Sequence, residues 1–199
     1  MSTTVDKKAT RRVRTSSADM RERVLAAAGR AFSRAGYDAV GIREIAAAAN
    51  ADPAIVIRLF GSKAGLFATL AEQAFGDEAL FDGPLKTLGA RLAGHLMLPI
   101  SVAAEDDIDE MNDFQFLLRS ATSLTAAPIL SAALHRALIE PLGRRIGEPD
   151  GFARAAMITA QILGFSTLRF ALGSQPIEAA DRGATTQRLA GILQLCIDG

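Results

Sequence analysis

The chain has no tryptophan, one tyrosine and one cysteine among its 199 residues. A single cysteine, Cys196, excludes an internal disulfide framework and is typical of a reducing cytosol. No stretch has the charged, apolar and small-residue order of a signal peptide. No apolar run reaches the roughly 18 uncharged residues of a membrane span, since the best candidate, residues 152–172, contains Arg154 and Arg169. We therefore expect a cytoplasmic protein that does not enter the membrane.

Residues that carry catalysis or bind metal ions are also scarce. The chain has two histidines, His95 and His135, and it has no phosphate-binding loop, metal-ligand spacing or nucleophile signature. The acidic run at residues 105–110 lacks the alternating ligands and central glycine of a calcium loop. Carboxylates at a helix N-terminus explain this run more simply. We therefore expect neither an enzyme nor a bound cofactor or metal.

The composition favours an all-α fold. Hydrophobic residues make up 49% of the chain, which is enough for a substantial core. A sequence rich in Ala and Leu, with few β-branched runs, favours helices, and neither strand alternation nor an internal repeat is visible. We expect about nine helices. Four of them lie before residue 76, and the other five are expected at residues 85–103, 107–124, 128–146, 151–172 and 183–197.

Charge is unevenly distributed, although the formal net charge is zero. Residues 1–63 contain 12 Lys and Arg against 6 Asp and Glu, whereas residues 64–199 contain 10 against 16. This asymmetry favours a polyanionic partner for the N-terminal end only, with a solvated basic face as the alternative. Residues 1–16, which include Lys7, Lys8 and three arginines, predict a disordered basic arm. Such an arm is either an ordinary tail or lies along DNA phosphates.

Residues 17–76 predict a compact domain of short helices. Ser17 is a suitable N-cap for the first helix. Apolar residues recur up to Phe32 with the spacing of one buried face, and Gly36 is expected to end this helix. The second helix is expected at residues 42–49, with an apolar stripe on its inner side.

A very tight turn joins the second helix to the third. Asn50 tolerates the left-handed backbone that such a turn commonly needs. Asp52 can cap the third helix, and Pro53 fits its first position, where no amide hydrogen is needed. The third helix is expected to run to Phe60, and a fourth is expected to begin near Lys63. Three helices with this turn are the layout of a helix-turn-helix DNA reader.

A gap-free set of residues between positions 21 and 70 is typical of one family: Val24, Leu25, Ala27, Ala28, Phe32, Gly36, Tyr37, Ile42, Arg43, Glu44, Ile45, Ala46, Ala49, Phe60, Lys63 and Leu66. At these positions the chain resembles the DNA-binding domain of the TetR/AcrR (tetracycline-repressor) family. Residues 151–180 are similar to C-terminal domains of actinobacterial-type members. The resemblance implies an all-α homodimer with two DNA-binding heads. It also implies a C-terminal domain, here residues 77–199, that dimerises through its last two helices and binds a small molecule whose binding releases DNA.

The expected reading surface departs from the family pattern. Gly41 stands where the family usually has Thr or Ser, Ile55 and Ile57 stand where it has a hydroxyl residue and a tyrosine, and Leu59 stands where His or Tyr is common. Hydrogen-bond readout needs donors or acceptors at base edges, so we expect binding to depend on phosphates and DNA shape more than on base reading. Arg58 either contacts DNA or is simply exposed to solvent. The candidate DNA-binding residues are Gly41, Arg43, Asp52, Ala54, Ile55, Arg58 and Lys63.

The C-terminal helices contain apolar residues that suit two roles. Those of the middle helices would line a cavity for an apolar or amphipathic effector, or would form ordinary core packing. The last two helices are apolar over more than one face, which predicts a four-helix interface between two copies. Arg169, in this apolar setting, needs an acidic or carbonyl partner. The candidate effector-binding residues are Met97, Met111, Phe114, Leu117, Met157 and Phe165, and the candidate interface residues are Ile158, Ile162, Phe165, Leu189, Ile192, Leu193 and Cys196.

The sequence therefore predicts a ligand-responsive, DNA-binding transcriptional regulator, expected to be a repressor. Its expected partners are a double-stranded DNA operator, an unknown small-molecule effector and a second copy of the chain. The alternative is a ligand-binding or protein-interaction dimer of the same fold, whose sequence-specific DNA binding is weakened by Ile55, Ile57 and Leu59. The substitution Ile57→Tyr is expected to discriminate between the two.

Overall fold

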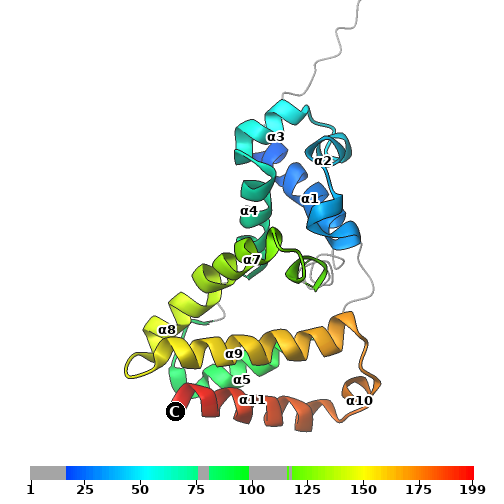
Figure 1. Ribbon diagram of the computed structural model, residues 1–199. Helices are drawn as coiled ribbons and strands as arrows, with labels where there is room; N and C mark the ends of the chain where they lie inside the picture. Colours follow the sequence, from blue (N-terminus) through cyan, green and yellow to red (C-terminus); the bar gives the residue numbers. More distant parts are fainter. Residues whose placement is uncertain (1–16, 76–80, 99–115, 117) are drawn as a thin grey trace, which may run out of the picture.

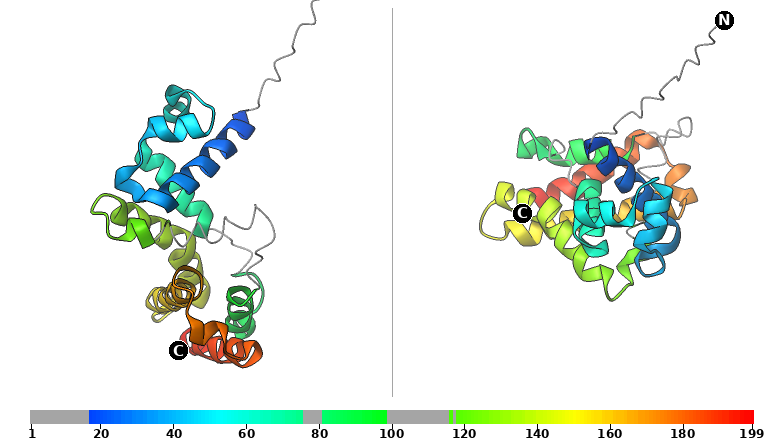
Figure 2. Two further views of the ribbon diagram at one scale, coloured as in Figure 1. Left: turned by 90° about the vertical axis from the view of Figure 1, so that its right-hand side faces the viewer. Right: turned by 90° about the horizontal axis from the view of Figure 1, so that it is seen from above.

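The computed structural model describes residues 17–75, 81–98, 116 and 118–199 of the chain. These residues form helices and no strand, which confirms the predicted all-α fold. Residues 17–75 form the head, and the other described residues form the larger body (Figure 1, Figure 2). The basic arm predicted at residues 1–16 lies outside the described residues.

Helices of different lengths make up both parts. The head contains α1 (Ser17–Ala39), α2 (Ile42–Ala48), α3 (Pro53–Phe60) and α4 (Lys63–Phe75). The body contains η2 (Leu85–Thr87), α5 (Leu88–Leu96), α7 (Ala126–Leu134), η4 (His135–Ile139), α8 (Glu140–Ile146), α9 (Gly151–Ser166), η5 (Thr167–Ala171), α10 (Gln175–Glu178) and α11 (Arg182–Asp198). The elements η4 and η5 are π-helical turns that continue α7 and α9. None of the described helices alone has the length and apolarity to cross a membrane, while the bent pair of α3 and α4 meets the length and composition test only.

The predicted helix boundaries agree best in the head, where α3 and the start of α4 match the prediction. In the body, the helix predicted at residues 85–103 is too long, because α5 ends at Leu96 and the chain then turns. Arg169, on η5, donates hydrogen bonds to the carbonyl oxygens of Leu96 and Leu98 at this turn. Its side chain is 6% exposed and also lies 3.6 Å from a carboxylate oxygen of Glu178. Arg169 therefore has both kinds of partner that its apolar setting requires.

Two further predictions for the body need correction. The helix predicted at residues 107–124 is helical at residues 116 and 118–121 and turns at residue 122, while its first part lies outside the described residues. The loop predicted after residue 172 contains a helical turn, α10, which begins at Gln175. A proline in its first turn is compatible with this start, because the first helical amides need no intrahelical partner.

Gly36 divides α1 and sets the centre of the head. Its φ of 77° and ψ of 168° lie outside the helical region, where a residue with a side chain would be strained. The prediction that Gly36 ends the first helix is therefore only partly right, since helical residues continue to Ala39. The kink is followed directly by Tyr37, which is 7% exposed and packs against Phe32 and Phe67.

In the body, α5, α9 and α11 pack together at the end of the molecule away from the head (Figure 1). At Gly89 in α5, a Cβ atom would lie 2.6 Å from the carbonyl oxygen of Ala190 in α11. The amide of Gln194 links the same helices, because its oxygen accepts from the Gly89 N–H at 3.1 Å and its nitrogen donates to the Leu85 carbonyl at 3.1 Å. The core between these helices is aliphatic and includes Leu88, Leu92, Ile158, Leu189 and Leu193.

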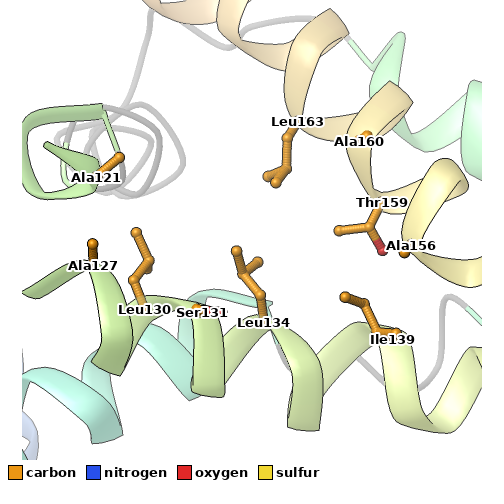
Figure 3. Close-up of a pocket in the computed structure, with 10 residues that line it drawn as sticks. All are labelled: Ala121, Ala127, Leu130, Ser131, Leu134, Ile139, Ala156, Thr159, Ala160 and Leu163. Atoms are coloured by element: carbon orange, nitrogen blue, oxygen red, sulfur yellow. The ribbon is translucent and has the colours of Figure 1, made fainter. Parts of the chain in front are cut away.

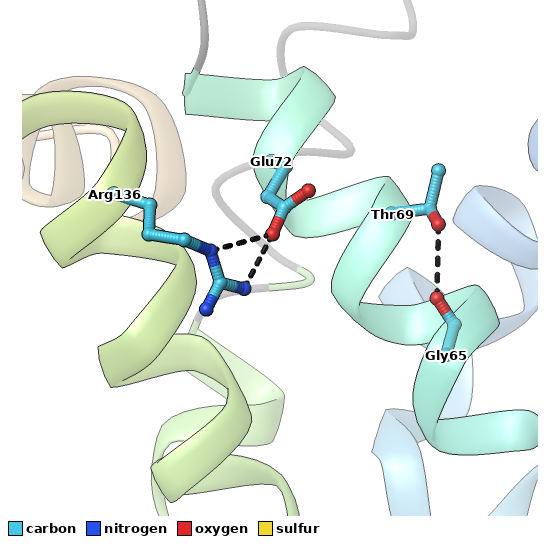
Figure 4. A network of polar contacts seen from close by, with 4 residues as sticks. All are labelled: Gly65, Thr69, Glu72 and Arg136. Carbon is cyan, nitrogen blue, oxygen red and sulfur yellow. Dashed lines mark hydrogen bonds and ion pairs between the residues drawn. The ribbon is translucent and has the colours of Figure 1, made fainter.

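Head and body meet where α4 packs against α7 and η4. Arg136 in η4 points its guanidinium at Glu72 in α4, and Figure 4 shows this pair beside the Thr69–Gly65 hydrogen bond within α4. Arg136 Nε donates to Glu72 Oε1 at 2.9 Å, and Nη2 donates to the same oxygen. Because the two side chains are 54% and 43% exposed, the ion pair contributes at most about 1 kcal/mol.

Candidate functional site

The turn between α2 and α3 has the geometry that its residues predict. Asn50 adopts a left-handed φ of 52°, and the Ala51 N–H donates to the Ala46 carbonyl at 2.8 Å. Asp52 caps α3, because its Oδ1 accepts from the Ala54 N–H at 2.7 Å. The carboxylate of Asp52 therefore fixes the start of α3, and as an acceptor only it offers no hydrogen-bond donor to DNA.

Helix α3 turns one face into the head and the opposite face to solvent. Val56 is fully buried, whereas Ala54, Ile57 and Arg58 are exposed, Ile57 at 44%. Ile55, a predicted DNA-binding residue, is half-buried, so Ile57 presents more apolar surface than Ile55 does. The solvent face of α3 can thus contact thymine methyl groups and offers one guanidinium for hydrogen bonds.

Groups that suit phosphate binding lie beside α3. Gly41 precedes α2 with an exposed, extended backbone, and a Cβ atom there would meet nothing within 4 Å. Arg43 and Arg58 are both exposed, and neither pairs with another described residue. Lys63 opens α4, with its side chain half-buried. The predicted candidates Gly41, Arg43, Arg58 and Lys63 therefore all leave polar groups at the surface of the head, where phosphates are recognised.

Two aromatic rings hold cations in the head, and the sequence pattern did not reveal either pair. The Nζ atom of Lys63 lies 4.2 Å from the ring centroid of Tyr37, and the guanidinium carbon of Arg21 lies 5.3 Å from the ring centroid of Phe60. Burial, and then the nearby carboxylate of Asp38, raises the pKa of Tyr37 above its ordinary value of 10.0. The partners are far apart in the sequence, so only the packing of α1 against α3 and α4 brings them together.

The body contains an open pocket of about 320 Å³ between α7 with η4 on one side and α9 on the other (Figure 3). A volume of this size suits a small organic ligand. The hydroxyls of Ser131 and Thr159 are the polar side-chain groups of its wall, and Thr159 Oγ1 already donates to the Ala155 carbonyl at 2.8 Å. The described residues of the wall include no charged side chain; they are Ala121, Ala127, Leu130, Ser131, Leu134, Ile139, Ala156, Thr159, Ala160 and Leu163.

The predicted effector-binding residues do not line this pocket where the structure describes them. Met97 is buried, Met157 is 58% exposed, and Phe165 packs half-buried against the core. Met111, Phe114 and Leu117 lie outside the described residues. The sequence prediction favoured large, flexible side chains, whereas the described wall consists mainly of alanines and larger aliphatic residues, with one serine and one threonine. The sequence pattern that could have identified the wall is the recurrence of small and apolar residues every three or four positions. It is present in Ala127, Leu130, Ser131 and Leu134 and again in Ala156, Thr159, Ala160 and Leu163.

Three of the predicted dimer-interface residues are buried within one protomer. Ile158, Leu189 and Leu193 are 0%, 6% and 0% exposed, because α5, α9 and α11 pack together there within one protomer. Of the other predicted residues, Ile162, Phe165 and Cys196 are half-buried and Ile192 is 49% exposed. The exposed large apolar side chains of α9, η5 and α11 are Phe152, Met157, Leu168, Ile192 and Leu195.

Two family models match the chain, one for each part. The model of bacterial regulatory proteins of the tetR family matches residues 24–70, which contain the helix-turn-helix. The model of the tetracyclin repressor-like C-terminal domain matches residues 87–197, more than half of the chain. Comparison with curated proteins gave no match.

Solved structures of regulators share the fold over nearly their whole length. A TetR-family regulator from Streptomyces coelicolor A3 is 26% identical, with a TM-score of 0.60 over 90% of this chain and 95% of that chain. NalD, the secondary repressor of the MexAB-OprM multidrug efflux pump in Pseudomonas aeruginosa, is 18% identical, with a TM-score of 0.63 over 89% and 96%. The fatty acid degradation regulator FadR from Bacillus halodurans is 16% identical, with a TM-score of 0.59 over 87% and 97%. With a helix-turn-helix head and a helical body that both match family models, the chain belongs to the TetR family of DNA-binding transcriptional regulators.

Proposed function

We propose that the protein is a homodimeric repressor that binds a DNA operator through its heads and is released by a small, neutral, apolar effector. The observation that carries this proposal is that the same helices line the pocket and pack against the head. Helix α7 and η4 form one wall of the pocket and also pack against α4. Helix α4 in turn packs against α3, the helix whose exposed face is available to DNA. A molecule that displaces α7 therefore acts on the orientation of α3.

Operator binding is proposed to depend mainly on phosphate contacts. Arg43, Arg58 and Lys63 and the Gly41 backbone supply cations and an amide at the surface of the head. The exposed Ile57 and Ala54 supply only apolar contacts to bases. Such an interface loses affinity steeply as salt rises, and it discriminates between sequences through DNA shape more than through hydrogen bonds.

The effector is proposed to be uncharged and largely apolar. A charged ligand in this pocket would lose its hydration without gaining an ionic partner from the residues that are described in the wall. The hydroxyl of Ser131 can orient one polar group of a ligand, while Thr159 already uses its hydroxyl proton within α9. The regulated genes would then respond to a hydrophobic compound.

Dimerisation is proposed to use the outer faces of α9 and α11. Met157 and Leu168 on the α9 side and Ile192 and Leu195 on α11 are 47–71% exposed, and α9 and α11 lie against each other. Two such helices from each copy would form a four-helix interface with two-fold symmetry. We expect Leu195→Asp to shift sedimentation from dimer to monomer, while Leu124→Asp, which changes a 95% exposed leucine outside these helices, leaves the dimer intact.

Operator binding is tested by titrating the purified protein against the DNA upstream of its own gene at several salt concentrations, with fluorescence anisotropy as the readout. We expect saturable binding whose affinity falls as salt rises, and weaker binding to unrelated promoters. Binding that is absent, or that does not depend on salt, would contradict the proposal.

The effector site is tested with N-phenyl-1-naphthylamine, a neutral dye that fluoresces in apolar surroundings. We expect the dye to bind the wild-type protein and to weaken its DNA binding. Ala160→Phe, which fills the wall, should reduce dye binding, whereas Ala153→Phe, on an exposed position of the same helix outside the wall, should not. Equal dye binding by both variants would place the effector site elsewhere.

A second function is favoured by one observation, the aliphatic reading face. A dimer that binds ligands or proteins but has lost specific DNA reading would carry Ile57 without a functional cost. Ile57→Tyr discriminates, because the solvent-exposed position accepts the ring and its hydroxyl. Higher affinity for the upstream DNA would support a regulator with a weakened reading face. Wild-type protein and Ile57→Tyr that both bind upstream and unrelated DNA equally would support the second function.

A further inference from the structure

Four aromatic rings meet at the centre of the head, and one of them comes from the body. Tyr37 lies 4.8 Å from Phe67 in an edge-to-face arrangement and 5.8 Å from Phe32, measured between ring centroids. Phe116, a residue of the body, lies 4.6 Å from Phe67. All four side chains are at most 7% exposed. The two rings that pack against Tyr37, Phe32 and Phe67, are therefore themselves in contact with Phe116 of the body.

The ammonium group of Lys63 lies over the face of the same Tyr37 ring. A cation 4.2 Å from a ring centroid is within the range in which the ring face attracts it. Lys63 is half-buried and has no acidic partner among the described residues. The ring face is therefore the group that restricts this ammonium, at the start of α4 beside the exposed end of α3.

The helical residues 116 and 118–121 connect this ring to the pocket. Phe116 contacts Phe67 at one end, and Ala121 lines the pocket at the other. Between them, the carbonyl oxygen of Arg119 lies 3.3 Å from where a Cβ atom of Gly36 would be, so this segment also touches the kink that precedes Tyr37. The described residues of this segment therefore contact both the pocket and the ring of Phe67, which packs against Tyr37.

We propose that Tyr37 and Phe116 are positioning residues for DNA binding: the ring of Tyr37 holds the Lys63 ammonium for a phosphate contact, and Phe116 sets the place of that ring from the body. The inference rests on the proposed operator binding through the head. It gives the body a direct influence on one phosphate contact, separate from any change in the distance between two heads. A ring that only filled the core would change stability without acting through Lys63.

The first experiment is a double-mutant cycle on affinity for the upstream DNA, measured by anisotropy over a series of salt concentrations. Tyr37→Phe keeps the ring face and should change affinity less than about twofold, whereas Tyr37→Leu should weaken binding about two- to fivefold. Lys63→Gln should lower the salt slope by about one. In the Lys63→Gln background, Tyr37→Leu should cause no further loss. An equal loss in both backgrounds would overturn the proposal while leaving operator binding intact.

The contribution of Phe116 is tested in the same way. Phe116→Leu keeps an apolar side chain and should weaken DNA binding about twofold with Lys63 present and not at all with Lys63→Gln. Ile45→Val is the matched control, since it trims a fully buried head residue that belongs to no aromatic contact. Losses of DNA affinity of similar size for Phe116→Leu and Ile45→Val would show that Phe116 acts only as a core residue. Wild-type protein that does not bind the upstream DNA would instead overturn the proposed function.

A second measurement does not depend on DNA binding. The chain has only four lysines, Lys7, Lys8, Lys63 and Lys86, so selective carbon-13 labelling of lysine gives few signals. Methylene protons of Lys63 above the ring of Tyr37 should be shifted upfield, and Phe116→Leu should reduce that shift. Lys63 protons at the position of a free lysine in the folded protein would overturn the proposal.

Discussion

The head and the body bury their cores with different side chains. In the head, Phe32, Tyr37 and Phe67 meet with Phe116, and their ring centroids lie 4.6–6.3 Å apart. In the body, the largest fully buried side chains of α5, α8, α9 and α11 are aliphatic, and α5 meets α11 at a glycine. Large rings concentrate the burial of the head in a few residues, whereas the body spreads it over long helices. The head should therefore respond as one unit, and the body should tolerate an open pocket.

Polar contacts differ between the parts as well. In the head, the hydrogen bonds that cap helices are local, as where Asp52 accepts from the Ala54 N–H. In the body, arginines join segments that are distant in the sequence by donating to carbonyl oxygens: Arg145 to Phe81, Arg154 to Cys196 and Arg169 to Leu98. Charge-assisted hydrogen bonds of this kind are stronger than neutral ones. The body therefore keeps its long helices in place with a small number of long-range contacts.

The largest expected effect comes from removing a ring of the head. Phe67→Ala should lower the free energy of unfolding by about 3–5 kcal/mol, because the side chain is fully buried and touches three other rings. Tyr37 is the one tyrosine and the chain has no tryptophan, so tyrosine fluorescence reports the head alone. Denaturant titration followed by fluorescence and by far-ultraviolet circular dichroism should show the head unfolding before the body.

The contrast between head and body would fail if, in Phe67→Ala, tyrosine fluorescence and circular dichroism showed unfolding at the same denaturant midpoint. That result would mean that head and body unfold as a single unit, held together by Phe116 and the contact of α4 with α7. Phe67→Leu is the control, since it keeps most of the apolar contact and should fall between the wild type and the alanine variant.

A smaller loss of stability, in the body instead of the head, is expected from a substitution at Gly89. Gly89→Ala should destabilise the body by about 1–3 kcal/mol, because the new methyl group would meet the backbone of Ala190 and Gln194 at 2.6–2.7 Å. Gly94 lies in the same helix with nothing within 4 Å of a Cβ atom, so Gly94→Ala should stabilise by about 0.5–1 kcal/mol. Circular dichroism should detect both shifts. A loss of stability in both variants would show that α5 is strained by any added side chain, and not by its approach to α11.

How far the sequence predicts the structure also differs between the two parts. In the head, the turn at Asn50, the cap at Asp52 and the limits of α3 were all predictable, because each depends on the residue itself and its immediate neighbours. The exposure of Ile57 over Ile55, and the pairing of Lys63 with Tyr37, depend on how α1, α3 and α4 pack. Contacts between residues that are distant along the chain cannot be inferred from a single sequence.

In the body, the sequence predicted helices but not their contacts. It required a partner for Arg169 without identifying the carbonyl oxygens of Leu96 and Leu98, since these lie at the end of α5 and in the turn after it, far away in the sequence. It assigned Ile158 and Leu193 to a dimer interface, although one protomer buries them by itself. An apolar helix face has to be covered, but its periodicity does not say by which neighbour.

A weaker prediction concerns the ion pair that joins the two parts. A double-mutant cycle of Glu72→Gln and Arg136→Gln should give a coupling energy of about 0.2–1 kcal/mol, because the pair is half exposed. The coupling should shrink at high salt. Exchanging the charges, with Glu72→Arg and Arg136→Glu together, should recover part of it. A coupling near zero would leave the packing of α4 on α7 as the connection between head and body.

The smallest expected effect is the dependence of head stability on alkaline pH. Burial and the Asp38 carboxylate raise the pKa of Tyr37 in the folded head above 10.0, so the folded state holds the phenol proton more tightly than the unfolded chain does. The resulting stability is fully present below pH 10 and is lost as pH rises through the higher folded pKa. Tyr37→Phe has no proton to lose there, so its free energy of unfolding, followed by circular dichroism, should fall less than that of the wild type above pH 10. The two proteins differ only at this phenol, so the difference between their losses of stability reports on Tyr37. Equal decreases would mean that the phenol of Tyr37 is as well hydrated in the folded head as in the unfolded chain, which its 7% exposure argues against.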